Sequence, residues 1–276
     1  MSHTSAELAF AKEAAAAGAT TALHHFGGEL QRSKKSDGSW VTQADKAAEA
    51  ELRRLIAAAY PDHNVLGEED GLRAADGGNP RDGAPTWIVD PIDGTNNFML
   101  GVPIWATLVA LRVDGDVQLG VCHAPAIGET YEGELGGGAR CNDRPISADT
   151  STKLADAVVL YSSAQSFFRK GLDEFFEYLI RRSWRSRGFG DFWGHMLVAR
   201  GAAQVMVEPT LATWDVAALL PIVSEAGARL THLHGEGWSG SGSALTTTNL
   251  LHDEIVALAR TMAPDWREPI RELGAR

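Results

Sequence analysis

The sequence predicts a mixed α/β or α+β fold in which helices and sheets are layered. Helical patterns fill the first 60 residues, strand patterns crowd together between residues 87 and 135, and the two alternate after about residue 146. The chain has 276 residues, of which 44% are apolar and 22% are charged. This composition is ordinary for a globular protein, argues against disorder, and allows a substantial core.

Two helices are predicted in the first 60 residues. Residues 5–26 are rich in alanine, which indicates a helix that packs closely through a smooth face. Residues 43–60 form an amphipathic pattern that ends before Pro61. The apolar side of that pattern holds Leu52, Leu55 and Ile56, and its charged side holds Glu49, Glu51, Arg53 and Arg54. The stretch 71–86, rich in Gly, Pro and Asp, is predicted to be a surface loop.

The rest of the chain carries short alternating segments. Strands are predicted at 87–90, 105–113, 117–122 and 130–135, with a hairpin turn at Asp114-Gly115. Helices are predicted at 165–181, 191–201 and 215–226, and further strands at 203–208 and 228–232. A boundary near residue 145 would divide the chain into 1–145 and 146–276. The candidate site described below draws on both halves, so we expect one integrated catalytic unit.

The charge balance excludes some classes of partner. The formal net charge of −11 argues against binding to nucleic acid or to an anionic membrane, because such surfaces repel an acidic protein. An anionic substrate would need a local reversal of the field, and a bound metal ion is the obvious means.

The location is predicted from three features. Glu7, Lys12 and Glu13 interrupt the N-terminal segment where a signal peptide would need an unbroken apolar core. No apolar run approaches the roughly 20 residues that span a bilayer. The two cysteines, Cys122 and Cys141, are too few for a disulfide scaffold or a zinc cluster. We therefore expect a soluble, cytoplasmic protein with reduced thiols.

The segment Trp87–Phe98, which reads WIVDPIDGTNNF, suggests a metal site. An apolar strand ends at Asp90, and Asp93 follows after Pro91 has biased the backbone to an extended form. Hard cations prefer several oxygen ligands that converge from a rigid base. The amides of Gly94, Thr95 and Asn96 would form a phosphate cradle at a helix start. The alternative is a solvated turn in which Asp93 caps the helix.

Two further acidic segments strengthen the metal interpretation. Glu68 and its acidic neighbours follow the strand-like residues 64–66, and Asp215 stands at the start of an apolar helix. Separately, these segments have ordinary explanations as a solvated turn and a helix cap. Three such segments in one chain favour a shared site.

Four ordered motifs together resemble the inositol monophosphatase family of magnesium-dependent, lithium-sensitive phosphomonoesterases. They are V-T-x-x-D (41–45), G-E-E (67–69), WIVDPIDGTNNF (87–98) and WDVAALLPIVSEAGA (214–228). The resemblance covers roughly residues 5 to 260. It implies a layered αβαβα sandwich of the inositol monophosphatase and fructose-1,6-bisphosphatase type, and a homodimer.

The resemblance also implies residue roles. Glu68, Asp90, Asp93, Asp215 and the carbonyl of Ile92 would bind two or three Mg²⁺ ions. Asp45, Glu68 and Thr95 would position the attacking water, while the amides of Gly94 and Thr95 would hold the phosphate of a small substrate. Asn96 departs from the common Thr, but this leaves both carboxylates and the cradle in place. Lys34 matches a family lysine near the site, although a solvated loop lysine is the alternative.

The run 187–201, RGFGDFWGHMLVARG, bears on the substrate. It is similar to bacterial histidinol-phosphate phosphatases of the family, an activity of histidine biosynthesis. Asp191 and Glu208 would meet the substrate's ammonium and imidazole, with Phe192 or Trp193 as a flat wall and Arg187 as a further contact. Three alternatives stay open: an inositol-phosphate or broad sugar or polyol phosphatase, a non-catalytic accessory role, and a helix-cap role for Asp191. Phe192 and Trp193 also fit a core or a dimer interface.

Overall fold

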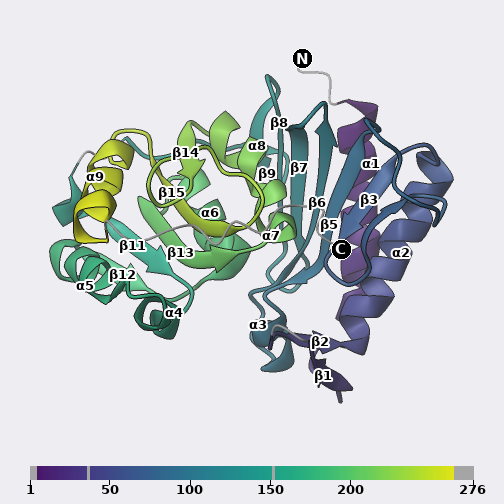
Figure 1. Ribbon diagram of the computed structural model, residues 1–276, viewed down its shortest axis with the longest axis horizontal. Helices are drawn as coiled ribbons and strands as arrows, with labels where there is room; N and C mark the ends of the chain where they lie inside the picture. Colours follow the sequence, from purple (N-terminus) through teal and green to yellow (C-terminus); the bar gives the residue numbers. More distant parts are fainter. Residues whose placement is uncertain (1–4, 36–37, 151–152, 264–276) are drawn as a thin grey trace. The chain divides into compact units, whose positions relative to one another are not determined.

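The computed structural model describes residues 5–35, 38–150 and 153–263 (Figure 1). The chain forms two compact units. Unit 1 comprises Met1–Arg144 and Ala217–Ile222, and unit 2 comprises Pro145–Val216 and Val223–Arg276. Within the described residues, no helix is both long enough and apolar enough to cross a membrane.

Unit 1 is built on an eight-stranded sheet in the order β10-β9-β8-β7-β6-β5-β3-β4. Its strands are β3 (Asn64–Gly67), β4 (Gly71–Ala74), β5 (Thr86–Asp93), β6 (Ala106–Val113), β7 (Asp116–Ala124), β8 (Glu129–Glu134), β9 (Gly138–Cys141) and β10 (Arg144–Pro145). β3 and β5 are parallel, and the pairs from β5 through β9 are antiparallel. β1 (Arg32–Lys34) pairs with β2 (Trp40–Thr42) in a separate ribbon.

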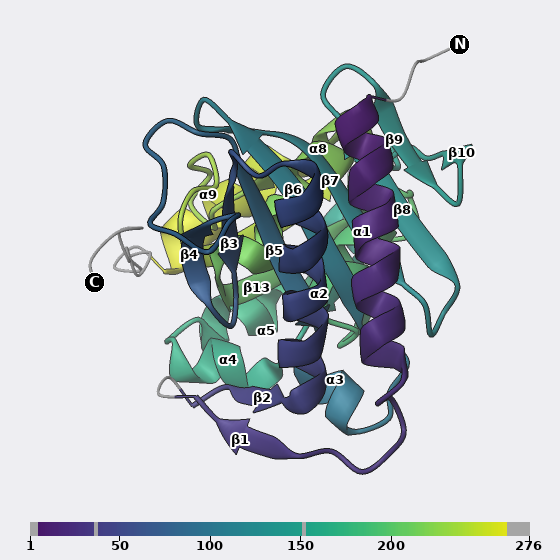
Figure 2. The same ribbon diagram turned by 90° about the vertical axis from the view of Figure 1, so that its right-hand side faces the viewer.

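Two long helices, α1 (Ala6–Leu23) and α2 (Gln43–Ala59), lie side by side over this sheet (Figure 2). α1 is buried mainly through small side chains, which confirms the predicted smooth face: Ala11, Ala14, Ala15, Gly18, Ala19 and Ala22. α2 buries Leu52 and Ile56 against Trp87 and Val89 of β5. Glu49 is also buried, so its predicted place on the charged side, opposite Leu52 and Ile56, is wrong.

Two turns of unit 1 bear on the predicted hairpin at Asp114-Gly115 and on the predicted loop 71–86. Asp114 and Gly115 have φ values of 52° and 95°, which confirms the predicted hairpin turn between β6 and β7. The predicted loop 71–86 is wrong for its first residues, because β4 pairs antiparallel with β3. The tight turn from Gly67 to Gly71 brings the two strands into register, with Gly71 at a φ of 65°.

Unit 2 contains a five-stranded sheet in the order β12-β11-β13-β15-β14. Its strands are β11 (Val158–Tyr161), β12 (Arg185–Arg187), β13 (Val205–Leu211), β14 (Ala228–Thr231) and β15 (Gly242–Thr248). Its helices are η1 (Leu154–Asp156), α4 (Ala164–Arg169), α5 (Asp173–Arg182), α6 (Asp191–Ala199), α7 (Thr213–Ala217), α8 (Leu219–Glu225) and α9 (His252–Met262), of which α7 and α8 cross into residues assigned to unit 1.

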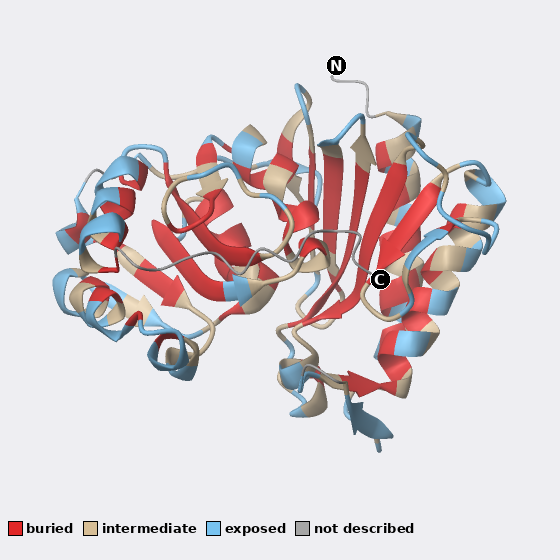
Figure 3. Ribbon diagram, in the orientation of Figure 1, coloured by how far each residue is buried: buried red, intermediate tan, exposed pale blue. Residues whose placement is uncertain are grey.

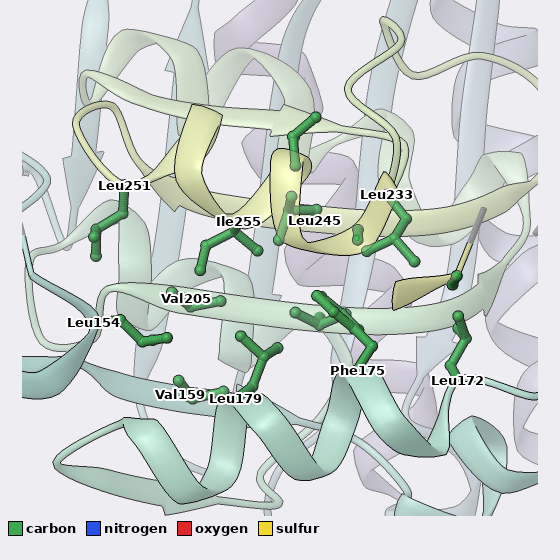
Figure 4. Close-up of a cluster of buried hydrophobic side chains, with 14 of the residues drawn as sticks. Leu154, Val159, Leu172, Phe175, Leu179, Val205, Leu233, Leu245, Leu251 and Ile255 are labelled. Atoms are coloured by element: carbon green, nitrogen blue, oxygen red, sulfur yellow. The ribbon is translucent and has the colours of Figure 1, made fainter. Parts of the chain in front are cut away.

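The two faces of this sheet carry different residues. Val205 and Val207 of β13 and Leu245 of β15 join α5 and α9 in one apolar core (Figure 4). Because side chains alternate along a strand, Met206, Glu208 and Thr246 belong to the opposite face. α6 packs there: a Cβ on Gly194 would come within 2.5 Å of Met206 Sδ. Both sheets are buried along most of their length (Figure 3).

Two predicted helices are each split in the structure. The helix 165–181 breaks into α4 and α5 at Gly171, whose φ is 69°. The helix 215–226 breaks into α7 and α8 because Pro221 has no amide to donate and its ring conflicts with the carbonyl four residues earlier. β15 is a strand that the sequence pattern does not predict, although its seven residues are all buried between β13 and β14.

Residues 217–222 pack closely on the sheet of unit 1. A Cβ on Gly120 of β7 would collide with the backbone of Ala218, and one on Gly133 of β8 would lie 2.7 Å from Ile222 Cα. These two glycines therefore allow the start of α8 to approach the strands at backbone distance. Asp215 lies only two residues before this anchored segment.

Candidate active site

Glu49 of α2 organises the acidic turn that follows β3. Its carboxylate accepts hydrogen bonds from the amides of Glu69 (2.7 Å) and Asp70 (3.0 Å). Arg53 donates to the same carboxylate at 2.8 Å and to the carbonyl of Gly71 at 2.7 Å. A buried charge is tolerated when it is paired and hydrogen-bonded in this way. Glu49 and Arg53 of α2 thus fix the backbone of the turn that carries Glu68.

Lys35, and not Lys34, reaches the acidic turn. Lys35 Nζ lies 2.7 Å from both Glu68 Oε1 and Glu69 Oε1. Lys34 is exposed and its ammonium lies 5.1 Å from the ring centre of Trp40. Lys34 therefore fits its alternative as a solvated lysine, and its neighbour Lys35, which directly follows β1, is the lysine that reaches Glu68. Burial disfavours the charge of Lys35, but the two carboxylates outweigh it and raise the lysine's pKa.

The carboxyl groups of this turn are shifted toward their neutral forms. Burial raises the pKa of Glu68 against the opposing effect of Lys35, and Asp45 raises it further. Burial also raises the pKa of Glu69, to about 7. The Asp90 carboxyl group lies near enough to Glu68 to oppose this rise in its pKa. A bound cation would favour the charged forms of these neighbouring carboxyl groups.

Asp90 and Asp93 lie together at the end of β5. Each offers a carboxylate oxygen within 4.8 Å of the other, and both side chains are buried. The ladder between β5 and β6 shifts register between them, and Asp90 Oδ1 accepts a hydrogen bond from the amide of Ile92 at 3.0 Å. This bulge brings Asp90 and Asp93 together although they are three residues apart.

Asp45 and Thr95 meet beside this pair. Thr42 and Asp45 form a capping box at the start of α2, with Asp45 Oδ2 accepting from the Thr42 amide at 2.7 Å. Asp45 Oδ1 lies 3.2 Å from Thr95 Oγ1, which is also 3.0 Å from the carbonyl oxygen of Ile92. Burial raises the pKa of Asp45, while the bonds from Thr42 and Thr95 oppose the shift. Three predicted site residues, Asp45, Ile92 and Thr95, are therefore brought together.

The short helix α3 (Thr95–Met99) begins directly after Asp93. Gly94 is its N-cap residue, with a φ of 87°, and has no side chain that could cap the helix. Asp93 therefore does not occupy the cap position that the alternative interpretation gave it. The first amides of a helix have no carbonyl partner within it, so the start of α3 offers hydrogen-bond donors directly after Asp93.

Asp215 belongs to unit 2. Its Oδ2 accepts a hydrogen bond from the amide of Ala212 at 2.7 Å, which places it in the first turn of α7 rather than at the cap position. Its carboxyl group also acts electrostatically on Asp191.

Asp191 opens α6 in a strained conformation. Its φ is 51°, and the N-cap position is occupied by Gly190, with no side-chain cap. The alternative role of Asp191 as a helix cap is therefore wrong. Burial raises the pKa of Asp191 to about 8, and the charges of Glu208 and Asp215 act in the same direction. Unit 2 thus gathers three carboxyl groups, which favours the approach of a cation.

Glu208 is held by a histidine that the sequence analysis missed. Glu208 Oε2 lies 2.9 Å from His195 Nε2, and His195 Nδ1 lies 2.7 Å from Thr246 Oγ1. All three side chains are buried. His195 stands four residues after Asp191, on the same face of α6. That spacing was the available signal, but its partner Thr246 lies on β15, which was not predicted.

The remaining candidates in the run 187–201 are Arg187, Phe192 and Trp193, and their contacts differ from one another. Arg187 is exposed on β12 and donates to the carbonyl of Ser186 at 2.7 Å. Phe192 is almost fully buried, so its predicted core alternative holds. Trp193 packs against Phe189, with ring centres 5.0 Å apart, and lies 6.0 Å from the Arg200 guanidinium.

Comparison with known proteins decides the family. The family model described as inositol monophosphatase family matches residues 4–263. The chain belongs to this family. The match confirms the resemblance drawn from the four motifs, and with it an enzyme that hydrolyses phosphoric monoesters. The family is magnesium-dependent, and the carboxylate oxygens of Glu68, Asp90 and Asp93 are the hard donors that Mg²⁺ prefers.

Individual relatives agree with the family match. The chain is 41% identical over 233 residues to the histidinol-phosphatase of Mycobacterium tuberculosis, covering 83% of this chain and 87% of that protein. It is 39% identical over 238 residues to the histidinol-phosphatase of Streptomyces coelicolor, covering 83% and 86%. Among solved structures, the Thermotoga maritima IMPase has a TM-score of 0.83 at 30% identity, covering 95% and 99% of the two chains. This structural similarity confirms the predicted mixed, layered α/β fold.

Proposed function

We propose that this chain is a Mg²⁺-dependent histidinol-phosphate phosphatase, which converts L-histidinol phosphate and water to L-histidinol and phosphate in histidine biosynthesis. The observation that carries the substrate assignment is that Asp191 and Glu208 lie near enough in unit 2 for the charge of Glu208 to raise the pKa of Asp191. A primary ammonium group fits such a carboxyl pair, whereas a neutral polyol needs no such site. The two histidinol-phosphatase relatives support the same assignment.

We propose that both units contribute to one metal centre of two or three Mg²⁺ ions. Its ligands would be Glu68, Asp90, Asp93, the carbonyl of Ile92, and Asp215. Asp215 lies two residues before Ala217, the first residue of the segment 217–222 that packs on β7 and β8. Two residues of extended chain span about 7 Å. Bound Mg²⁺ would supply a water of lowered pKa and stabilise the charge on the leaving oxygen. On this proposal the two units act as one catalytic unit.

The chain's own residues would align the reaction. Thr95, held by Asp45 at 3.2 Å, would orient the attacking water together with Glu68. The amides of Gly94 and Thr95 would bind the phosphate oxygens at the start of α3. Asp191 and Glu208 would accept hydrogen bonds from the cationic end of the ester, with Trp193 and Arg187 as neighbouring contacts. No residue needs to form a covalent intermediate.

The decisive experiment measures phosphate release from a panel of monoesters in Mg²⁺, ranked by kcat/KM. We expect L-histidinol phosphate to exceed inositol 1-phosphate and a simple sugar phosphate by at least about tenfold. A preference for inositol phosphate would overturn the substrate assignment and keep the metal mechanism. Asp191→Ala should then raise KM for the ammonium-bearing ester selectively, and an equal effect on both esters would argue against the role given to Asp191.

We also propose that the enzyme is a homodimer, as the family resemblance implies. Light scattering coupled to gel filtration should give a mass near twice the chain mass of 29.6 kDa. A single-chain mass at micromolar concentration would contradict this.

A further inference from the structure

We infer that His195 is a positioning residue for substrate selection: it fixes Glu208 so that one carboxylate oxygen is held inside unit 2 and the other faces the cationic end of the ester. This inference rests on the proposed function. The residue, His195, is neither one of the proposed metal ligands nor one of the groups proposed to bind the phosphate.

The geometry of His195 leaves little freedom. The imidazole is fully buried between α6 and the sheet, with both ring nitrogens in hydrogen bonds of 2.7 and 2.9 Å. An ionised carboxylate can only accept hydrogen bonds, so Nε2 carries the proton that is donated to Glu208. When the ring is neutral, the Thr246 hydroxyl donates to Nδ1 and thereby fixes this tautomer.

The sheet places all three residues on one face. Met206 of β13 is paired with Thr246 of β15, and Glu208 follows two residues after Met206, so Glu208 and Thr246 point to the side covered by α6. Gly194 permits the close approach of α6, because a Cβ there would collide with the Met206 thioether. His195, the next residue, enters the space between the two polar side chains.

Only one oxygen of Glu208 is used in this arrangement. Among the residues that the structure describes, the bond from His195 to Oε2 is the hydrogen bond made by this carboxylate. Oε1 is thus left to meet a ligand, and the electrostatic effect of Glu208 on Asp191 shows that the two carboxyl groups share a neighbourhood. Without the His195 bond, the carboxylate could rotate about its last bond and lose its direction.

The test compares His195→Leu, His195→Gln and the matched control His232→Leu on two esters. His232 is a second buried histidine of unit 2, bonded to the carbonyl of Ser243 and stacked on Trp238. For His195→Leu we expect KM for L-histidinol phosphate to rise about tenfold to hundredfold, as for a lost hydrogen bond to a charged group, with little change for glycerol 2-phosphate. Gln, whose amide can donate at a similar reach, should restore most of the loss.

The outcomes separate the inference from the proposed function. His232→Leu should lower the melting temperature and leave the ratio of the two kcat/KM values unchanged. Equal losses on both esters for His195→Leu, or no rescue by Gln, would overturn the positioning role. A wild-type enzyme without preference for the ammonium-bearing ester would instead overturn the proposed substrate, and the inference with it. If His195→Leu fails to fold, the comparison of His195→Gln with Thr246→Val on the same two esters decides.

Discussion

Gly67 lies directly over the Glu49 carboxylate. A Cβ at Gly67 would stand 2.6 Å from Glu49 Oε2 and would touch the whole carboxylate group. The absence of a side chain here lets α2 support the turn that carries Glu68, through the amides of Glu69 and Asp70. The glycine of the G-E-E motif is therefore explained by steric contact with a helix, and not by a left-handed backbone.

Gly67→Ala should therefore destabilise unit 1 and misplace Glu68. We expect the free energy of unfolding to fall by about 2 kcal/mol, because the added methyl must displace a buried carboxylate that is bonded to two amides and Arg53. Urea unfolding measures the effect. The control is Gly28→Ala, where a Cβ would meet only the His25 carbonyl at 3.5 Å. Equal stability of the two variants would contradict the account.

Asp93→Asn should abolish hydrolysis while the fold survives. Removing one charged oxygen from the cluster weakens its hold on a divalent cation, so we expect phosphate release to fall by at least about a thousandfold. The stabilisation of the wild type by Mg²⁺ in thermal melts should also disappear. Asp116→Asn, on an exposed hairpin position, serves as the control. Activity near that of the wild type would refute the proposed metal site.

Lys35→Gln and Lys34→Gln should differ sharply. The ammonium of Lys35 compensates two carboxylates whose own burial disfavours their charge. Its loss should lower stability in EDTA by about 2 kcal/mol, and Mg²⁺ should restore part of it. Lys34, exposed over Trp40, should show almost no effect. Thermal melts with and without Mg²⁺ make the comparison, and similar behaviour of the two variants would show that Lys35 is dispensable.

Asp191 should make the metal-free protein less stable as the pH rises. Because its folded pKa is raised to about 8 from 3.8, the folded state holds a proton that the unfolded state releases. Stability is therefore greatest below about pH 4 for this group and is lost progressively up to about pH 8. Asp191→Asn should exceed the wild type by on the order of 2 kcal/mol at pH 9, with the difference vanishing toward pH 4.

Denaturant unfolding at several pH values measures whether the stability difference between Asp191→Asn and the wild type grows as the pH rises. Asp253→Asn is the opposite case, because the bonds from His252 and Arg229 lower the pKa of Asp253. Its contribution is present above its ordinary pKa and is lost as the pH falls, so this variant should gain nothing at pH 9. An Asp191→Asn variant with the same pH profile as the wild type would contradict the burial of a neutral carboxyl group.

Local chemistry made much of the site predictable. The segment D-P-I-D-G-T places two carboxylates, a carbonyl and a helix start within six residues, so a strand and its turn bring them together wherever the strand lies. The sequence does not point to Lys35, because spacing alone does not show which of two neighbouring lysines reaches the acidic turn. The charge pattern places Glu49 on the charged side of α2, because such a pattern does not show the buried ion pair of Glu49 with Arg53.

The sequence by itself determined the order of the helices and most strands, the four motifs, and the family, since these depend on residue periodicity and on short spacings. Tertiary structure decided which distant residues share a face. β15 lies between β13 and β14 although it follows both in the chain, and only that pairing brings Thr246 to His195 and Glu208. The physical reason is that strand pairing depends on burial and register across the whole unit, which no local window contains.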